Sequence, residues 1–492
     1  MYHFVAIVFS KNDRPPRDSF DIKSHRECSC AYMVDTDSSA RKGSTLNREW
    51  TQGPIVNNLL LLSWPMIVME ATYMVSQIFD MVWVGKAGAS SIAGLGIANL
   101  VMMLISTIDM ALISGSRAVI ARFVGSRDWE GARKAAGQTY ILAVSWGVLV
   151  TIAGSLLAGP IMHLFGVEET VALEGIRYLR VFFAGWLSLE ILIISLYTIQ
   201  STGDSFNPML IELSIRAIHL TLCPFLVLGL WFFPQLGIAG AALSNVISQA
   251  LGAIAGLWVL FGGHTRIKLS LRDFRFVPDI AWRILKIGFP SMISMLQANL
   301  STFVITLIIV PFGTRVIAAN SLVSNVQGFI ITPNLGLGSA VGVLVGQNLG
   351  AKQPERAVKT TLLGAGILEA FLIACGVAVL IWAERIVFLF NNDPTLVAIG
   401  AAFLRITTAS YLVMGINAAL MNCISGAGDT LPNMIINIVM VWVIQIPLTY
   451  ILSHYTSIGV YGIRWAMVVS TVVGTIAYFI YFRLGRWKLK KV

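Results

Sequence analysis

The sequence predicts an all-α membrane protein with twelve transmembrane helices, in two homologous six-helix bundles related by a parallel pseudo-two-fold symmetry. Three observations lead to this prediction: apolar segments long enough to cross a bilayer, basic residues concentrated in alternate loops, and an internal repeat. Of the 492 residues, 56% are hydrophobic and only 12% are charged, which is about half the charged share of a typical soluble domain. This composition excludes an ordinary soluble globular protein.

Residues 1–52 differ in composition from the rest of the chain. They are polar, mixed in charge and without apolar periodicity, so we expect a flexible cytosolic N-terminal tail. Cys28 and Cys30 are separated by one residue, a spacing that matches no familiar tetrahedral metal site, and we expect no metal here or elsewhere. The five cysteines are odd in number, so the sequence predicts no disulfide framework.

Twelve apolar segments follow the tail, each with about 20 residues or more, the length that crosses a bilayer as a helix. Backbone polar groups in lipid must be satisfied within the segment, so all twelve are expected to be helical. The segments lie near residues 57–82, 92–123, 137–160, 175–200, 208–231, 238–262, 282–309, 317–346, 360–383, 398–424, 433–454 and 459–483. We assign residues 53–264 to the N-terminal bundle, 265–281 to a cytoplasmic linker, 282–485 to the C-terminal bundle and 486–492 to a basic cytosolic tail.

Basic residues indicate the orientation. They gather in the loops after the second, sixth and eighth segments and in the C-terminal RLGRWKLKKV, all on one side of a twelve-helix threading. The positive-inside rule therefore places both termini in the cytoplasm, in a multi-pass protein of the cell membrane. The net charge of +10 is dispersed over these short loops, which is not the pattern of a nucleic-acid-binding face.

An internal repeat relates the two halves of the chain. Residues recur at a constant offset of 225, as in the pairs Pro65 and Pro290, Gly88 and Gly313, Glu130 and Glu355, Phe165 and Phe390, and Arg180 and Arg405. An even number of spans in each repeat gives both halves the same orientation, so the pseudo-two-fold axis runs along the membrane normal. This symmetry creates a cavity between two bundles that rocking can open to either side, and it favours a secondary transporter.

Four repeated motifs carry a resemblance to a known family. FVGSRDWEGARKA and LVGQNLGAKQPERAVKT, together with TGDSFNPM and GAGDTLPNM, resemble the multidrug and toxic compound extrusion (MATE) family, prokaryotic type, over about residues 55–485. The resemblance implies an antiporter that exports small organic compounds, cationic or amphipathic, in exchange for H⁺ or Na⁺. It implies no cofactor beyond the coupling ion, and a monomer in the lipid bilayer without a nucleic-acid partner.

Two other functions remain open. A flippase for lipid-linked oligosaccharides or lipids, from the same superfamily, would favour several arginines in its cavity. A membrane receptor or enzyme without transport is the alternative from a different class. We expect no enzyme and no catalytic residues, because the sequence has no HExxH, GxSxG or phosphate-cradling loop.

Glycine and aspartate in the repeated motifs have a mechanical interpretation. Each repeat has two glycines that suit tight turns at helix ends, where positive φ favours glycine, namely Gly125, Gly203, Gly350 and Gly428. Asp204 and Asp429 follow two of them and are expected to cap the next helix.

Ionisable residues within the spans are concentrated in the N-terminal half. Each costs about 2.5–3.5 kcal/mol on insertion scales, so each needs a partner, water or a function. They are Glu70, Asp80, Asp109, Arg117, Glu190, Glu212, Arg216 and His219, whereas in the other half only Glu369 is clearly in mid-helix. Ion coupling is therefore expected in the N-terminal bundle.

The first helix carries a polar stripe. Glu70, Tyr73, Gln77 and Asp80 are 3, 4 and 3 residues apart, so they share one helix face. The resemblance implies that Asp80 is the first-helix coupling aspartate of the family. Tyr73 and Gln77 are candidates for the substrate cavity.

In the fifth helix the sequence departs from the family pattern. The resemblance implies an Asn and, four residues later, an Asp before a proline, but those positions hold His219 and Cys223 here, with Asn245 of the sixth helix as a neighbour. Na⁺ prefers several oxygen ligands, and this exchange removes two. A proton needs one titratable carboxylate that a histidine can tune, so we favour H⁺ and keep Na⁺ as the alternative. His219 also fits a hydrogen-bonded core histidine that never titrates.

Other polar residues in the spans have two interpretations each. Glu212 and Arg216, four residues apart, either neutralise each other or belong to a gate in which Arg216 bridges to Glu70 or Glu190. In the C-terminal half, hydrogen bonding to substrate and helix-to-helix hydrogen bonding explain the polar residues nearly equally well. The candidates for the cavity there are Gln297, Asn299, Glu369 and Asn417.

Overall fold

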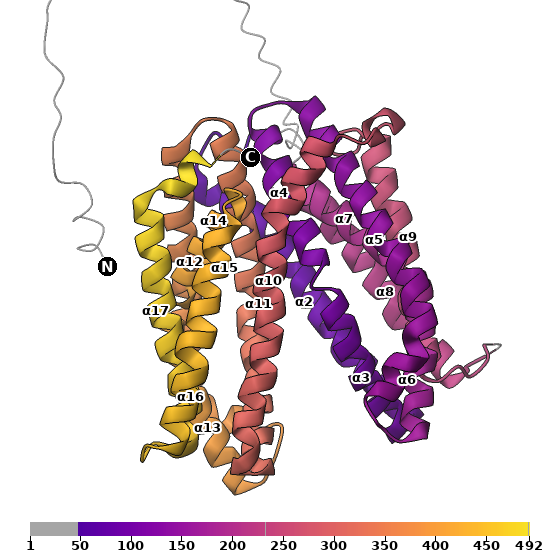
Figure 1. Ribbon diagram of the computed structural model, residues 1–492, viewed down its shortest axis with the longest axis vertical. Coiled ribbons are helices and arrows are strands. Elements are labelled where there is room, and N and C mark those ends of the chain that lie inside the picture. The colour runs from indigo at the N-terminus through magenta and orange to yellow at the C-terminus, as the bar shows by residue number, and fades with distance from the viewer. Residues whose placement is uncertain (1–47, 232, 491) are drawn as a thin grey trace, which may run out of the picture. The chain divides into compact units, whose positions relative to one another are not determined.

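The computed structural model describes residues 48–231, 233–490 and 492, and the N-terminal half of this part is a bundle of helices (Figure 1). Its sequence of long apolar runs broken by glycine-rich and charged loops sets the helix boundaries. The helices are α2 (Ile55–Ala87), α3 (Ala89–Ile105), α4 (Asp109–Gly125), α5 (Trp129–Leu164), α6 (Glu169–Ala184), α7 (Trp186–Ser201), α8 (Phe206–Leu228) and α9 (Ile238–Gly262).

The C-terminal half follows after the short 3₁₀ turn Leu271–Phe274. Its helices are α10 (Pro278–Ile309), α11 (Thr314–Gly350), α12 (Pro354–Phe388), α13 (Pro394–Thr408), α14 (Tyr411–Gly426), α15 (Thr430–Ile438), α16 (Ile446–His454) and α17 (Gly462–Leu484). A π-helical stretch, Val439–Gln445, joins α15 to α16.

The described residues contain nine helical segments that are long and apolar enough to cross a membrane, and twelve if each of three bent pairs is one span. The pairs are α3 with α4, α6 with α7, and α13 with α14, bent by 41°, 54° and 55°. In chain order these spans correspond to the twelve predicted segments, and the all-α, two-bundle prediction is confirmed. The halves differ at the second span of each, since α3 is broken from α4 whereas α11 is continuous through Pro333.

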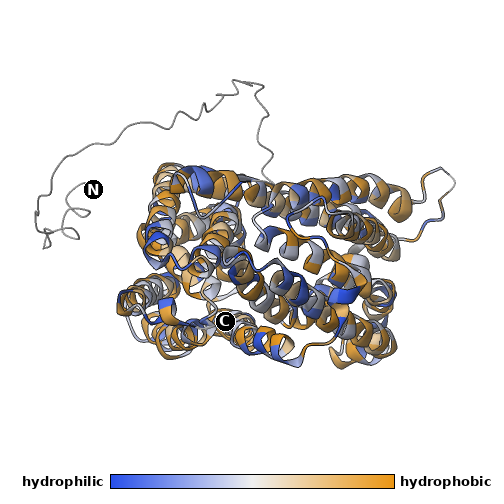
Figure 2. Cartoon of the chain, turned by 90° about the horizontal axis from the view of Figure 1, so that it is seen from above, coloured by the Kyte–Doolittle hydropathy of each residue, from blue (hydrophilic) through white to orange (hydrophobic). Residues whose placement is uncertain are grey.

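Residues of high hydropathy occur along the helices of both halves (Figure 2). Leu156, Trp258 and Phe303 are among many large apolar residues that are more than half exposed. A soluble monomer rarely exposes apolar surface on this scale, so the exposed surface of these helices is suited to lipid.

The two halves pack closely at the end that carries the basic loops. A Cβ atom added to Gly125 of α4 would lie 2.0 Å from the carbonyl oxygen of Gln347 in α11, and one added to Gly350 would lie 2.2 Å from that of Arg122 in α4. The two contacts are equivalent, because both pairs of residues are related by the repeat offset. Toward the end that holds α3, α6, α13 and α16, the ribbons of the two halves diverge (Figure 1).

This packing corrects the interpretation of two glycines. Gly125 and Gly350 allow close approach between the halves, and the residues with positive φ in those turns are Arg127 at 60° and Lys352 at 58°. By contrast Gly203 and Gly428 do adopt positive φ, at 93° and 80°.

The two motif aspartates also differ from each other. Asp204 accepts hydrogen bonds from the backbone N–H groups of Phe206 and Asn207, as a cap does. Asp429 makes no capping bond to α15 and instead pairs with Lys490 at 2.9 Å and with Tyr481. The two carboxylate oxygens of Asp429 are directed at Lys490 and Tyr481, and neither is directed at the first turn of α15.

The last residues assigned to the N-terminal tail belong to the folded part. Trp50 is buried, and the Asn58 amide donates to the carbonyls of Trp50 and Gln52. Arg356 of α12 donates to the carbonyl of Gln52 as well. Residues 48–52 are therefore held against both halves, while the rest of the predicted tail, with Cys28 and Cys30, lies outside the described residues.

Candidate functional site

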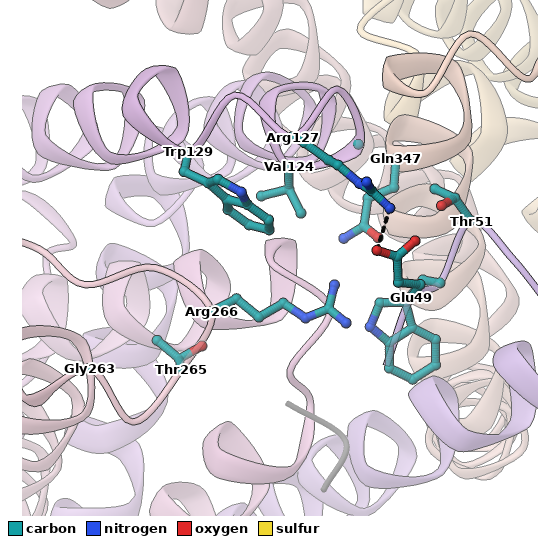
Figure 3. Close-up of a pocket in the computed structure, with 11 residues that line it drawn as sticks. Glu49, Thr51, Val124, Arg127, Trp129, Gly263, Thr265, Arg266 and Gln347 are labelled. Carbon is teal, nitrogen blue, oxygen red and sulfur yellow. Dashed lines mark hydrogen bonds and ion pairs between the residues drawn. The ribbon is translucent and has the colours of Figure 1, made fainter. Parts of the chain in front are cut away.

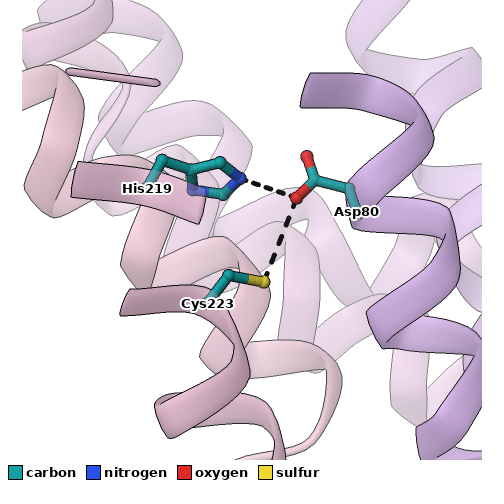
Figure 4. Close-up of side chains that lie close together, drawn as sticks. All are labelled: Asp80, His219 and Cys223. Carbon is teal, nitrogen blue, oxygen red and sulfur yellow. Dashed lines mark hydrogen bonds and ion pairs between the residues drawn. The ribbon is translucent and has the colours of Figure 1, made fainter. Parts of the chain in front are cut away.

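Asp80, His219 and Cys223 lie together in the N-terminal half (Figure 4). Asp80 comes from α2, and His219 and Cys223 are one turn apart on α8, so a single face of α8 presents both to α2. The Nε2 atom of His219 is 2.6 Å from Oδ1 of Asp80, and Sγ of Cys223 is 4.0 Å from the same oxygen. The packing of α2 against α8 brings Asp80 into contact with His219, which is 139 positions away in the sequence, and with Cys223, which is 143 positions away.

Ser244 of α9 determines which nitrogen of His219 carries a proton. The Ser244 hydroxyl donates to the carbonyl of Ala241 at 2.9 Å, so its oxygen accepts from Nδ1 of His219 at 3.1 Å. With Nδ1–H donating to Ser244, the 2.6 Å contact between Nε2 and Asp80 needs one further proton, on either the imidazole or the carboxylate.

The three side chains differ in their exposure. His219 and Cys223 are 0% and 1% exposed, whereas the side chain of Asp80 is 23% exposed. Asp80 is therefore the most accessible side chain of the three.

Asn245 lies apart from this group. Its amide oxygen accepts a hydrogen bond from Gln249 on the same helix, at 2.9 Å. Adjacent helix residues point about 100° apart, so the preceding residue, Ser244, faces His219. We predicted Asn245 as a neighbour of this group, and the side chain that contacts His219 is that of the preceding residue, Ser244.

Glu212 and Arg216 form a buried ion pair within α8. Nε of Arg216 is 2.7 Å from Oε1 of Glu212, and the guanidinium lies 4.9 Å from the ring centre of Tyr73 in α2. Of the two interpretations of these residues, this geometry agrees with local neutralisation. Glu70 lies nearby, within electrostatic reach of Arg117 and Glu212. Tyr73 and Gln77 are exposed on α2.

Glu190 of α7 does not face Arg216 but a second carboxyl group. It accepts a hydrogen bond from the indole of Trp186 at 3.0 Å, and Asp109 of α4 accepts one from Trp146 at 3.1 Å. The carboxyl groups of Asp109 and Glu190 lie within electrostatic reach of each other. Both are buried. Sequence reasoning missed this pair because nothing in the sequence places α4 beside this face of α7.

The candidate cavity residues of the C-terminal half mostly hold helices together. Gln297 accepts from the indole of Trp442 at 3.1 Å, and Asn417 donates to Thr475 at 3.1 Å. Glu369 accepts from the backbone N–H of Ile416 at 3.1 Å. For these three, helix-to-helix hydrogen bonding is the interpretation that the contacts support. The amide nitrogen of Asn299 is buried without a hydrogen-bond partner in the described part of the chain.

Arg464 of α17 is a buried cation that the sequence analysis overlooked. It donates to the side-chain oxygen of Gln327 and to the carbonyl of Asn320, both at 2.9 Å, and lies 5.4 Å from the ring centre of Phe403. The sequence could have indicated it, because Arg464 is a charged residue within the predicted apolar segment 459–483.

A pocket of about 430 Å³ opens at the end with the basic loops (Figure 3). Gln347 of α11 lines it together with residues of the N-terminal half, including Trp129 and the ion pair between Arg127 and Glu49. Burial lowers the pKa of Arg266, which also lines it, to about 10, so this arginine stays charged at neutral pH. The pocket lies near the N-terminal end of α2, whereas Asp80 lies near the other end of the same helix.

Comparisons with known proteins agree with this architecture. The family model MatE matches residues 65–225 and 290–451, one match in each half. The probable multidrug resistance protein NorM of Thermotoga maritima is 23% identical over 441 residues, covering 89% of this chain and 94% of that protein. The probable multidrug resistance protein YoeA of Bacillus subtilis is 25% identical, over 87% of this chain and 93% of that protein.

Solved structures share the fold. One, described as the outward-facing conformation of a multidrug resistance MATE family transporter of the MOP superfamily, has a TM-score of 0.84 at 24% identity, over 90% of this chain and 98% of the other. A MOP superfamily transporter from Pyrococcus furiosus has a TM-score of 0.83 at 24% identity, with the same coverage.

Proposed function

Because this chain belongs to the MatE family of transporters, we propose that it is a secondary antiporter that exports organic compounds in exchange for H⁺. The substrate class, cationic or amphipathic compounds, is supported by relatives named as multidrug resistance proteins that match over most of both chains. The basic loops support a cytoplasmic location for both termini.

The observation that carries the proposal is the contact between Nε2 of His219 and Oδ1 of Asp80, across which the two groups would share one exchangeable proton. The contact of 2.6 Å lies at the partly exposed face of Asp80, between two helices of one bundle. Releasing the proton leaves a carboxylate beside a neutral imidazole in a low-dielectric site, where a nearby organic cation would be attracted. Rebinding the proton removes that attraction, so proton and substrate favour opposite states of the same site.

The donor atoms support H⁺ over Na⁺ as the coupling ion. Na⁺ is a hard cation that prefers several oxygens, but the His219 and Cys223 side chains that contact the Asp80 carboxylate offer an imidazole nitrogen and a thiol sulfur. The hydroxyl of Ser244 is engaged by Ala241 and His219.

Helix α2 supplies a path from this site to the other bundle. Met74, six residues before Asp80, contacts Thr332 of α11 at 3.4 Å, and a Cβ atom added to Gly336 of α11 would lie 2.6 Å from the backbone nitrogen of Ile67. A change in the charge of Asp80 that moves α2 relative to α8 therefore also changes the contact between the halves. This is how proton exchange is expected to bias the rocking motion.

The test uses efflux of a fluorescent organic cation from proteoliposomes under an imposed gradient of either pH or Na⁺. We expect the pH gradient alone to drive wild-type transport and the Na⁺ gradient alone to fail. Asp80→Asn should lower the rate of pH-driven efflux about tenfold or more, because an amide cannot exchange the proton. Glu369→Gln in the other half is the matched control and should retain pH-driven efflux.

Three outcomes would contradict the proposal. Transport by Asp80→Asn at the wild-type rate would remove Asp80 from coupling. Efflux driven by Na⁺ alone, without a pH gradient or membrane potential, would replace H⁺ by Na⁺. Protein that inserts and folds but moves no organic cation while scrambling a labelled lipid would support the flippase instead.

A further inference from the structure

The cluster of Asp80, His219 and Cys223 has the donor atoms of a transition-metal site. It offers one carboxylate oxygen, one imidazole nitrogen and one thiol sulfur, and the three atoms lie within 4.8 Å of one another. Zn²⁺ binds such ligands at about 2.0–2.3 Å in tetrahedral geometry, which places neighbouring ligand atoms about 3–4 Å apart. The 2.6 Å contact is shorter than that range and the 4.0 Å contact lies at its upper end, so small side-chain rotations would bring all three atoms to one ion.

The surroundings fit a metal as well as the ligands do. Ser244 accepts from Nδ1 of His219, which leaves Nε2 as the coordinating nitrogen and fixes the ring, as hydrogen-bonding partners of metal ligands do. His219 and Cys223 are buried, whereas Asp80 is partly exposed, so an ion can enter from the Asp80 side. The same opening leaves room for a water molecule as the fourth ligand.

We propose that Asp80, His219 and Cys223 bind a thiophilic divalent metal ion, Zn²⁺ in the first instance, and that the bound ion blocks export. Sulfur and nitrogen donors select Zn²⁺ over Mg²⁺ or Ca²⁺, which prefer oxygen. On binding, the ion would displace the proton between Asp80 and His219 and the proton of the Cys223 thiol, both to solvent. It would fix α2 against α8, the two helices that proton exchange is proposed to move. Metal binding stands independently of the proposed function, whereas inhibition rests on it.

Cobalt titration of the full-length protein tests the binding. Co²⁺ is the spectroscopic probe for a zinc site, because a thiolate ligand gives a charge-transfer band and tetrahedral geometry gives strong visible bands. The protein carries a tag without histidines, and Cys223 is made its only cysteine. The background substitutions are Cys28→Ser, Cys30→Ser, Cys375→Ala and Cys423→Ala.

We expect one Co²⁺ per chain with a thiolate band, and displacement by Zn²⁺ but not by Mg²⁺. Cys223→Ser should lose the band, and Cys223→His should still bind Co²⁺ but without the thiolate band. His219→Gln should weaken binding by about tenfold or more. A sole-cysteine protein without a thiolate band overturns the proposal, as does a band that persists in Cys223→Ser. The parent titration decides this even if a variant fails to fold.

Zn²⁺ added to proteoliposomes tests the block. Half-inhibition of efflux should occur at the Zn²⁺ concentration that half-displaces Co²⁺. Cys223→Ser removes a metal ligand but leaves the contact between Asp80 and His219 in place, so it should need a higher Zn²⁺ concentration for half-inhibition. Binding without inhibition overturns the block. Equal inhibition of the wild type and Cys223→Ser also overturns it, because the ion would then act elsewhere. A failed proton-coupling test leaves the cobalt result unaffected, so the two proposals are distinguishable.

Discussion

The N-terminal and C-terminal halves differ in what their buried polar groups contact. In the N-terminal half, the carboxylate of Asp80 contacts the imidazole of His219, so two ionisable groups face each other. In the C-terminal half, Glu369 accepts from a backbone N–H group, and Arg464 donates to amide and carbonyl oxygens such as that of Gln327. These C-terminal contacts can hold helices together without any exchange of ions.

The difference is one of side chains and not of the packing between the halves. Gly125 and Gly350 make equivalent contacts at the end with the basic loops, each against a carbonyl of the opposite half. Closing this end therefore depends equally on both repeats, whereas proton exchange is proposed for one. Each prediction below tests one side of this comparison.

The largest effect is expected at the two equivalent glycines. Gly125→Ala and Gly350→Ala each place a methyl group about 2 Å from a backbone carbonyl oxygen, an overlap that neither helix can relieve by a rotamer change. We expect both variants to lose most efflux, because the halves can no longer close at this end. Efflux in proteoliposomes measures it.

Gly159→Ala and Gly366→Ala are the controls, since a Cβ atom at either position meets nothing within 4 Å. Both should transport normally. If only one of Gly125→Ala and Gly350→Ala were impaired, the equivalence of the two contacts would be wrong.

A smaller effect, on stability, compares the buried arginines of the two halves. Arg216→Met leaves the Glu212 carboxylate buried without its partner and should cost about 3–5 kcal/mol. Arg464→Met leaves only neutral oxygens unpaired, so it should cost about 1–3 kcal/mol. Thermal unfolding in detergent should show a larger loss of stability for Arg216→Met than for Arg464→Met. Adding Glu212→Gln to Arg216→Met should recover most of the loss; no recovery would mean that the charge pair is not the cause.

The smallest effect concerns a surface pair of the C-terminal half. The backbone N–H of Thr395, and then Arg315 at 2.9 Å, lower the pKa of Asp393 at the start of α13. A pKa that is lower in the folded state stabilises above the unfolded pKa, and this contribution is lost as pH falls through the folded pKa.

Asp393→Asn should therefore melt slightly below wild type at neutral pH, and the two melting curves should converge in acid. The effect is small because the pair is exposed. A gap that widened on acidification would have the wrong sign for a lowered pKa.

The sequence predicted the spans well because length and hydropathy alone determine which segments can cross a bilayer. It also predicted that Asp80, His219 and Cys223 belong together, since the i, i+4 spacing on α8 fixes one face and the family resemblance pointed to that face. What it missed depended on contacts between distant segments. Asn245 was predicted beside this group, but the preceding residue, Ser244, contacts His219, and adjacent helix residues point about 100° apart.

Other features had no local signal at all. Asp109 and Glu190 pair only because α4 packs beside α7, and neither hydropathy nor spacing indicates that packing. A glycine near a helix end suits either a turn or close packing, so Gly125 was assigned to the turn. Only the position of Gln347 on the opposite half distinguishes the two roles.

Proton release on substrate binding tests the central claim most directly. A transported organic cation is added to the purified protein in weakly buffered solution with a pH indicator. The account predicts release of about one proton per chain from wild type, since Asp80 and His219 share one, and none from Asp80→Asn. No release from wild type, or equal release from Asp80→Asn, would contradict it.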